Sequence, residues 1–104
     1  MYRLQKHEDS GWEHLDGTNI KGRIVNGWAT IVFEGYVHEG VEGQLETIFV
    51  LPDKYKPTVS VYFGLLENSR RASAYTCYIN NGSINMYLLH SKNNVVGSVT
   101  YPIS

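Results

Sequence analysis

The stretch IKGRIVNGWATIVFEG, residues 20–35, decides the fold class of this chain. At its centre lies Asn26-Gly27, a dipeptide that suits the two positive-φ positions of a type I′ turn. The segments on either side are rich in β-branched and aromatic residues, which strands favour, so we predict a β-hairpin. On the second arm both alternating sets of positions carry apolar residues. That pattern is typical of a strand covered on both faces, by its own chain or by a neighbouring subunit.

Similar strand signals recur along the rest of the chain. The segments are QLETIFVL, TVSVYFGLL, ASAYTCYI, SINMYLLH and VVGSVTYPI. A second hairpin turn is predicted at Asn81-Gly82, and LPDKYKP, residues 51–57, predicts a corner because each proline removes a ladder donor. The glycine-rich stretch Gly35 to Gly43 predicts a loop or a loose edge segment. We therefore predict an all-β fold, an antiparallel and jelly-roll-like β-sandwich of about seven strands.

The length of 104 residues allows one domain. Residues 1–19 show no sustained period and predict an entry arm, with Trp12 and Leu15 as apolar anchors. Residues 20–104 then form the β-sandwich. No apolar run approaches the roughly 18 residues of a membrane span, so we expect no membrane insertion.

Charge and cysteine content narrow the function classes. Nine basic and ten acidic residues give a net charge of -1, without a basic cluster. Phosphate binding needs such a cluster, so nucleic acid is not an expected partner. The single cysteine, Cys77, cannot form an internal disulfide, and its strand-like surroundings predict a small buried hydrophobe.

The sequence carries no catalytic motif. Its four histidines lack metal-ligand spacing, and neither a nucleophile elbow nor a phosphate-binding glycine loop occurs. We therefore predict no catalytic residues, no metal site and no cofactor, in a protein that is not an enzyme. The one enzymatic alternative is a glycosidase, which needs two carboxylates across a sugar. Its candidates are Glu34, Glu39, Glu42 and Glu46.

Aromatic residues are the remaining candidates for a function, since the chain has eight tyrosines and two tryptophans. Sugar rings stack on such side chains while neighbouring polar groups supply hydrogen bonds. The residues that suit this role are Trp28, Tyr36, Tyr62, Tyr75 and Tyr87. Aromatic pairs also stabilise sheets and subunit interfaces, so packing remains the alternative for each of them.

A set of ordered motifs resembles the C-terminal head domain of bacteriophage tail-tip and baseplate receptor-binding proteins. The motifs are GWEHL, IKGRIVNGWATIVFEG, LPDKYKP, YINNGSINMY and the terminal GSVTYPIS, and together they cover nearly the whole chain. The resemblance implies a β-sandwich head, usually a homotrimer, at the distal end of a longer tail protein that touches the host cell. It implies host cell-surface saccharides and other tail proteins as partners.

We therefore predict a receptor-binding head of the virion tail tip that recognises host saccharide without catalysis. The predicted contact residues come from the glycine-rich loop, the ENSRR loop and the exposed face of the second strand, and they are Trp28, Tyr36, His38, Glu39, Arg70 and Arg71. Two alternatives remain open. One is a structural, trimerising knob that caps a tail fibre, and the other is a wall-polysaccharide glycosidase module.

Overall fold

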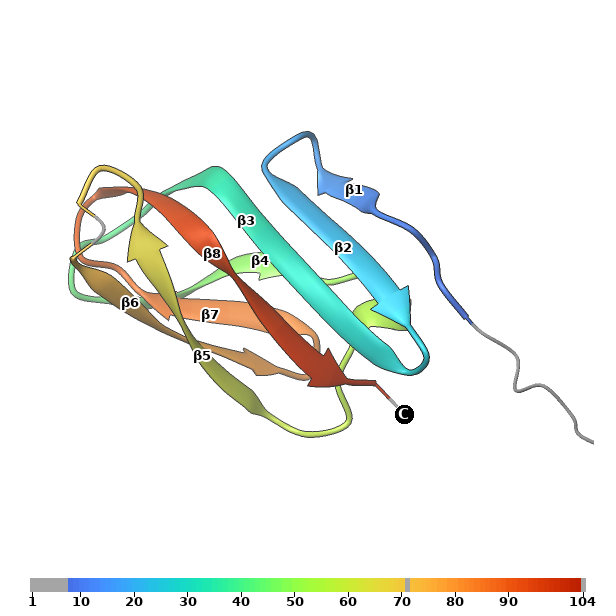
Figure 1. The fold of residues 1–104 in the computed structure, drawn as a ribbon. Coiled ribbons are helices and arrows are strands. Elements are labelled where there is room, and N and C mark those ends of the chain that lie inside the picture. Colours follow the sequence, from blue (N-terminus) through green and yellow to red (C-terminus); the bar gives the residue numbers. More distant parts are fainter. Residues whose placement is uncertain (1–7, 71, 104) are drawn as a thin grey trace, which may run out of the picture.

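A computed structural model describes residues 8–70 and 72–103, and its regular secondary structure is almost entirely antiparallel strand (Figure 1). One short 3-10 helix, η1 (Asp53–Tyr55), interrupts them. The strands are β1 (Glu13–Asp16), β2 (Ile20–Val25), β3 (Trp28–Glu39), β4 (Leu45–Val50), β5 (Val61–Glu67), β6 (Ala74–Asn80), β7 (Ser83–Tyr87) and β8 (Lys92–Pro102). The predicted all-β antiparallel class is confirmed.

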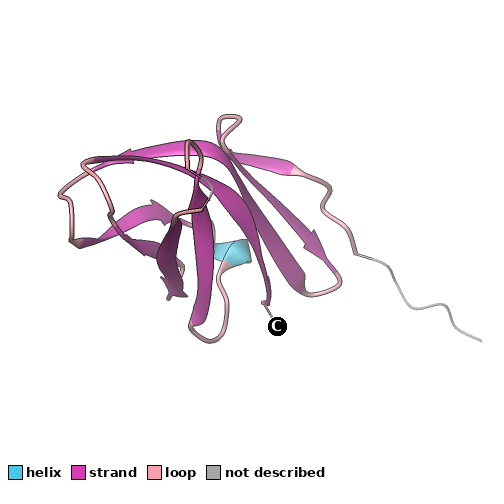
Figure 2. Cartoon of the chain, turned by 60° about the vertical axis from the view of Figure 1, so that its left-hand side comes forward, coloured by secondary structure: helices cyan, strands magenta, loops and turns pink. Residues whose placement is uncertain are grey.

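The eight strands form one sheet in the order β1-β2-β3-β8-β5-β6-β7-β4, and the sheet curls into a half-barrel (Figure 2). We call β1-β2-β3-β8 the first limb and β5-β6-β7-β4 the second limb. β8 pairs with β3 along its whole length. Its register with β5 spans only Leu66↔Val96 and Glu67↔Val95. The two limbs of one continuous sheet therefore take the place of the two sheets of a sandwich.

Both predicted hairpin turns are present. Asn26 and Gly27 have φ of 48° and 82°, and Asn81 and Gly82 have φ of 51° and 84°. Positive φ at both central positions is the requirement of a type I′ turn. β2 and β3 consequently pair without a shift, from Ile20↔Phe33 to Val25↔Trp28.

The proline-bounded corner places a buried side chain on the concave side of the half-barrel. We call this concave side the trough. Tyr55 of η1 is fully buried. The Tyr101 hydroxyl donates to the Tyr55 carbonyl at 2.6 Å, and the Tyr55 hydroxyl donates to Glu13 Oε1 at 2.8 Å. The ring lies against Gly22, where an ideal Cβ would stand 2.7 Å from Tyr55 Cε1. These contacts fix η1 between β2 and the ends of β1 and β8.

One expectation about local structure is wrong. The stretch Gly35 to Gly43 is not one loop, because β3 continues to Glu39 along β8 after a register shift between Glu34 and Tyr36. Gly35 (φ 77°) is the extra residue of this β-bulge, a geometry that favours glycine. The predicted entry arm contributes a strand to the sheet, since β1 pairs with β2, and Asp9 forms an isolated bridge with Val25.

The chain buries only the inward face of the sheet and leaves the outward face exposed. The inward residues of β3, Ala29, Ile31 and Phe33, are buried, whereas Trp28 on the outward side is 53% exposed. Cys77 is fully buried among the core residues, as predicted. In the described ranges, no helix has the length and apolar character needed to cross a bilayer.

Candidate functional site

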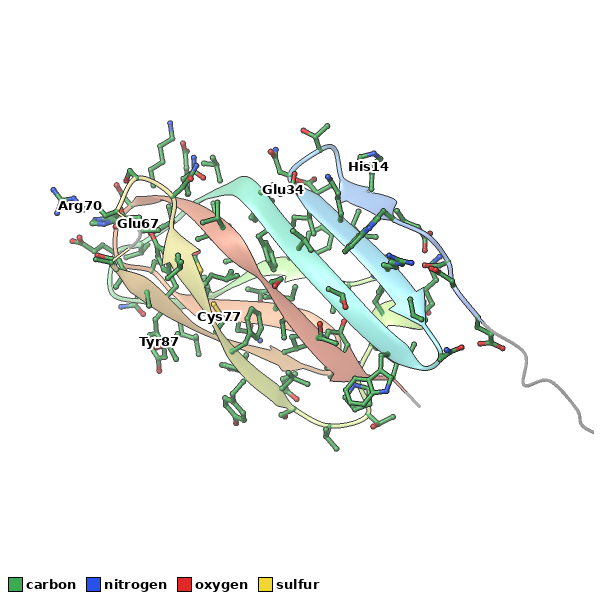
Figure 3. The ribbon with its side chains drawn as sticks, in the orientation of Figure 1. His14, Glu34, Glu67, Arg70, Cys77 and Tyr87 are labelled. Carbon is green, nitrogen blue, oxygen red and sulfur yellow. The ribbon has the colours of Figure 1, made fainter. Side chains whose placement is uncertain are left out.

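The predicted contact residues do not form one site. Trp28 begins β3, and His38 and Glu39 lie at its far end, a separation of roughly 35 Å along a strand. Arg70 is exposed in the loop between β5 and β6, close to Glu67 at one end of the molecule (Figure 3). Arg71 lies outside the described residues.

The Tyr36 side chain packs inside the trough of the half-barrel. The bulge at Gly35 shifts the register by one residue, so that Tyr36 pairs with the buried Val95 and its side chain turns inward. Its ring makes edge contacts with Phe33 (6.2 Å between centroids) and with Phe49 (6.3 Å). Burial raises the pKa of its hydroxyl. We therefore leave Tyr36 out of the candidate site.

His38 belongs to a set of paired groups at the end of the half-barrel. Its Nε2 lies 3.1 Å from Glu46 Oε1. The Val41 backbone N–H donates to Glu46 Oε2 at 2.8 Å, and this bond, together with the one to His38, lowers the pKa of Glu46. Nearby, His90 Nε2 lies 3.1 Å from Glu67 Oε1. The first pair links β3 to β4, and the second links the loop between β7 and β8 to β5.

Asn93 joins the two histidine segments. Its buried side chain donates to the carbonyls of His38 (3.2 Å) and His90 (2.8 Å), and it accepts from the His90 N–H (3.0 Å) and the Tyr75 hydroxyl (3.1 Å). Tyr75, one of the aromatic candidates for sugar stacking, is thus a buried structural residue.

The four carboxylates weighed for a glycosidase are close together in the sequence but lie in different structural settings. Glu34 lies on the outward side of β3 and pairs with Lys21 at 3.1 Å. Glu46 is held by His38 and Val41, and Glu39 and Glu42 are exposed. Among residues 8–70 and 72–103, no three His, Cys, Asp or Glu side chains are grouped as metal ligands.

Both tryptophans of the chain lie on the outward surface of the first limb. Trp12 is 51% exposed and Trp28 is 53% exposed. We call this surface the tryptophan face and define it by Trp12, Lys21, Arg23, Trp28, Val32 and Glu34. Glu34 and His14 are labelled along its upper margin in Figure 3. Of the two apolar anchors predicted for the entry arm, Leu15 packs against the core, whereas Trp12 lies half exposed on this surface.

An ion pair positions Arg23 beside Trp12. The Arg23 guanidinium donates through Nε and Nη2 to the two carboxylate oxygens of Asp9. This bidentate bond raises the pKa of Arg23. The guanidinium carbon lies 5.8 Å from the centroid of the Trp12 ring, within cation–π range. A half-exposed indole is thus held at a defined place.

Beside this indole the surface is hollowed. The hollow has a volume of about 280 Å³, and Trp12, Lys21, Val32 and Glu34 line it. It combines an aromatic ring, an apolar floor, an ammonium donor and a carboxylate acceptor, which are the groups that a sugar ring and its hydroxyls require. Sequence reasoning missed Trp12 and Lys21 as site residues, because only the pairing of β1 with β2 brings them together.

A second group of aromatic residues lies on the outward surface of the second limb. Four of the seven described tyrosines, Tyr36, Tyr55, Tyr75 and Tyr101, bond through their hydroxyls to protein oxygens inside the half-barrel. The other three point outward from β5, β6 and β7, and they are Tyr62, Tyr78 and Tyr87. The rings of Tyr62 and Tyr78 lie 5.7 Å apart across the strands. We call this surface the tyrosine face and define it by Leu45, Tyr62, Leu66, Thr76, Tyr78 and Tyr87.

Two sequence comparisons identify no relative of this chain. A scan against protein-family models finds no match, and a search of curated proteins finds no similar sequence.

Proposed function

We propose that this domain binds saccharide without catalysis and that the tryptophan face is the contact surface. The observation that carries the proposal is the placement of both tryptophans, each about half exposed, on one face with a polar-rimmed hollow beside Trp12. Exposed apolar surface that is rimmed by polar residues is typical of ligand-binding and partner-binding sites.

The chemistry of the hollow suits a sugar. The face of the Trp12 indole provides a surface for sugar C–H groups, and its fixed position lowers the entropy cost of binding. Lys21 and Glu34 provide a donor and an acceptor for hydroxyl groups, with their own ion pair keeping both side chains beside the ring. Of the residues predicted from the sequence, Trp28 belongs to this surface.

The resemblance to phage tail-tip head domains supports host cell-surface saccharide as the ligand class. On this proposal the chain is the recognition head of a tail protein, and attachment of the virion depends on it. The domain acts by holding the ligand, and the carboxylate Glu34 acts as a hydrogen-bond acceptor.

Binding to a glycan array and to isolated bacterial cell walls tests the proposal. We expect Trp12→Ala to weaken binding about tenfold or more, which corresponds to roughly 1.4 kcal/mol. Trp28→Ala should weaken binding to long saccharides more than binding to short ones, because it lies apart from the hollow. Tyr62→Ala, which removes an even more exposed aromatic ring from the other limb, is the control and should bind normally.

Circular dichroism and thermal unfolding establish that each variant is folded. A folded wild-type domain that retains no glycan or cell wall would contradict the proposal, as would normal binding by the Trp12→Ala variant. Hydrolysis of wall polysaccharide that is lost in Glu34→Gln would show instead that the surface is catalytic.

A further inference from the structure

The outward side chains of β3 form a straight row across the tryptophan face. β3 lies between β2 and β8 (Figure 1), and its register with both neighbours runs without a shift from Trp28 to Phe33. Alternate residues of a regular strand point to one face, so Trp28, Thr30 and Val32 follow one another on the outside. Val32 lines the hollow beside Trp12. Trp28 therefore lies roughly 13 Å from the hollow along the same strand.

The middle of this row offers a pair of hydroxyl groups. Thr30 Oγ1 lies 2.9 Å from Thr100 Oγ1, on the facing position of β8. In such a pair one hydroxyl donates to the other, so one O–H group remains as a donor and lone pairs remain as acceptors. A sugar hydroxyl is itself both a donor and an acceptor, and it finds both kinds of partner here. Arg23, the cross-strand neighbour of Thr30 in β2, borders the row on the other side.

The charges that border the row are paired within the chain. Lys21 lies 3.1 Å from Glu34, and Asp9 holds the guanidinium of Arg23. An anionic ligand drawn to Lys21 would also meet the carboxylate of Glu34. The outward residues of this part of β3 and of the adjoining part of β8 are uncharged, namely Trp28, Thr30, Val32, Ser98, Thr100 and Pro102. The row therefore suits an uncharged ligand.

We propose, on the basis of the proposed function, that the ligand of the tryptophan face is an uncharged, extended polysaccharide chain that lies along β3 from the hollow to Trp28. One sugar ring stacks against Trp12 in the hollow, and another ring of the same chain stacks on Trp28. The segment between them contacts the hydroxyls of Thr30 and Thr100. A single sugar ring is shorter than this row, so it reaches only one of the two indoles.

The length of the saccharide should determine its affinity. The entropy cost of association is met when the first ring enters the hollow, and contact of the same chain with Trp28 is then intramolecular. A fragment that reaches Trp28 should bind at least about tenfold more tightly than one that fills only the hollow. Fragments longer than this should gain little more. The affinity should also change little with salt, because salt screens only interactions between charges.

Sized fragments of bacterial cell-wall polysaccharide are the probe. Walls are partially hydrolysed, treated with protease, separated by anion exchange into uncharged and anionic pools, and sized by gel filtration. Titration calorimetry with the full chain measures the affinity for each pool at low and at high salt. We expect tighter binding to uncharged fragments than to anionic fragments of equal size. Within the uncharged pool, the affinity should rise with length and then level off.

Variants of the row test each contact. Trp28→Ala should weaken the binding of long fragments about tenfold and leave that of short fragments unchanged. Thr30→Val should weaken the binding of long fragments about fivefold, since it removes one hydrogen-bonding group. Trp12→Ala should weaken the binding of all fragments. The matched controls on the tyrosine face are Tyr87→Ala, which removes a ring that is 50% exposed, and Thr76→Val, and both should bind as wild type does.

The outcomes separate failure of the extended ligand from failure of the proposed function. Affinity that does not depend on length, or that Trp28→Ala leaves unchanged, would overturn the extended ligand, while binding lost in Trp12→Ala would still support the proposed function. Tighter binding to the anionic pool would overturn the uncharged class. Walls that bind only before protease treatment would assign the face to a protein ligand. A folded wild-type chain that binds no pool would contradict the proposed function itself.

Discussion

The hydroxyl of Tyr36 donates a hydrogen bond to the carbonyl of Ile48 at 2.6 Å. Tyr36 belongs to β3 in the first limb and Ile48 to β4 in the second, and these two strands do not pair in the sheet. Ile48 lies where the register of β4 with β7 shifts, between Thr47 and Phe49. The bond therefore links the two limbs across the trough, at a point where the strand ladder is irregular.

Loss of this bond should lower the stability of the domain. We expect Tyr36→Phe to reduce the free energy of unfolding by about 1 to 2 kcal/mol, since the change leaves a part-buried carbonyl without its donor. Urea unfolding followed by circular dichroism measures the effect. Tyr62→Phe removes a hydroxyl from the exposed face and should change the stability by less than about 0.5 kcal/mol. Equal effects of the two variants would show that the bond between the limbs is unimportant.

Gly22 should be intolerant of any side chain. A Cβ there would lie 2.7 Å from Tyr55 Cε1 and 2.8 Å from Tyr55 Cζ, and two hydrogen bonds hold that tyrosine in place. We expect Gly22→Ala to cost about 1 to 3 kcal/mol of unfolding free energy through overpacking. Gly64→Ala is the matched control, because its Cβ would meet only the Tyr75 carbonyl oxygen at an ordinary 3.5 Å. Similar melting temperatures for the two variants would contradict the close contact.

Glu13 should contribute to acid unfolding. Hydrogen bonds from Lys54 and from the Tyr55 hydroxyl lower the pKa of Glu13 below its ordinary value of 4.5. A depressed pKa in the folded state stabilises the fold above the unfolded-state pKa, and this stabilisation is lost as the pH falls through the folded-state pKa. The stability of wild type should thus fall more steeply below about pH 4.5 than that of Glu13→Gln.

Urea titrations at pH 7 and at pH 3 compare the two proteins. Glu42→Gln removes one negative charge from an exposed position and serves as the control for net charge. An identical acid dependence for wild type and Glu13→Gln would contradict the assigned role of the carboxylate.

Cys77 should be unreactive in the folded protein. Burial raises the pKa of its thiol to about 12, and its Sγ lies 3.8 Å from the Tyr75 carbonyl oxygen. The thiolate is the reactive form, so labelling requires the half-barrel to open. We expect labelling by a thiol reagent at pH 8 to be slow in buffer and fast in urea, with a rate that follows the unfolded fraction. Rapid labelling of the folded chain would show that β6 is accessible.

Local features of the sequence predicted the turns and the fold class. Asn26-Gly27 and Asn81-Gly82 each carry their own conformational preference, so the two hairpins could be placed before any contact was known. Cys77 was assigned to the interior for a similar reason, because its neighbours alternate as a strand does. The candidate site was harder to predict. The bulge at Gly35 reversed the direction of Tyr36, and a one-residue shift of this kind depends on the partner strand β8.

The sequence by itself determined that the chain is a set of short antiparallel strands joined by tight turns, because turn geometry and alternation are properties of neighbouring residues. Only the tertiary structure decided which aromatic residues face water. The pairing of β1 with β2 placed Trp12 beside Arg23 on the outside. The curl of the sheet enclosed Tyr55, Tyr75 and Tyr101 and left Tyr62 and Tyr87 exposed. A tyrosine packs in the core when its side of the sheet becomes the interior, and it can contact another molecule when that side stays outside. Contacts between residues far apart in the chain settle which side becomes the interior.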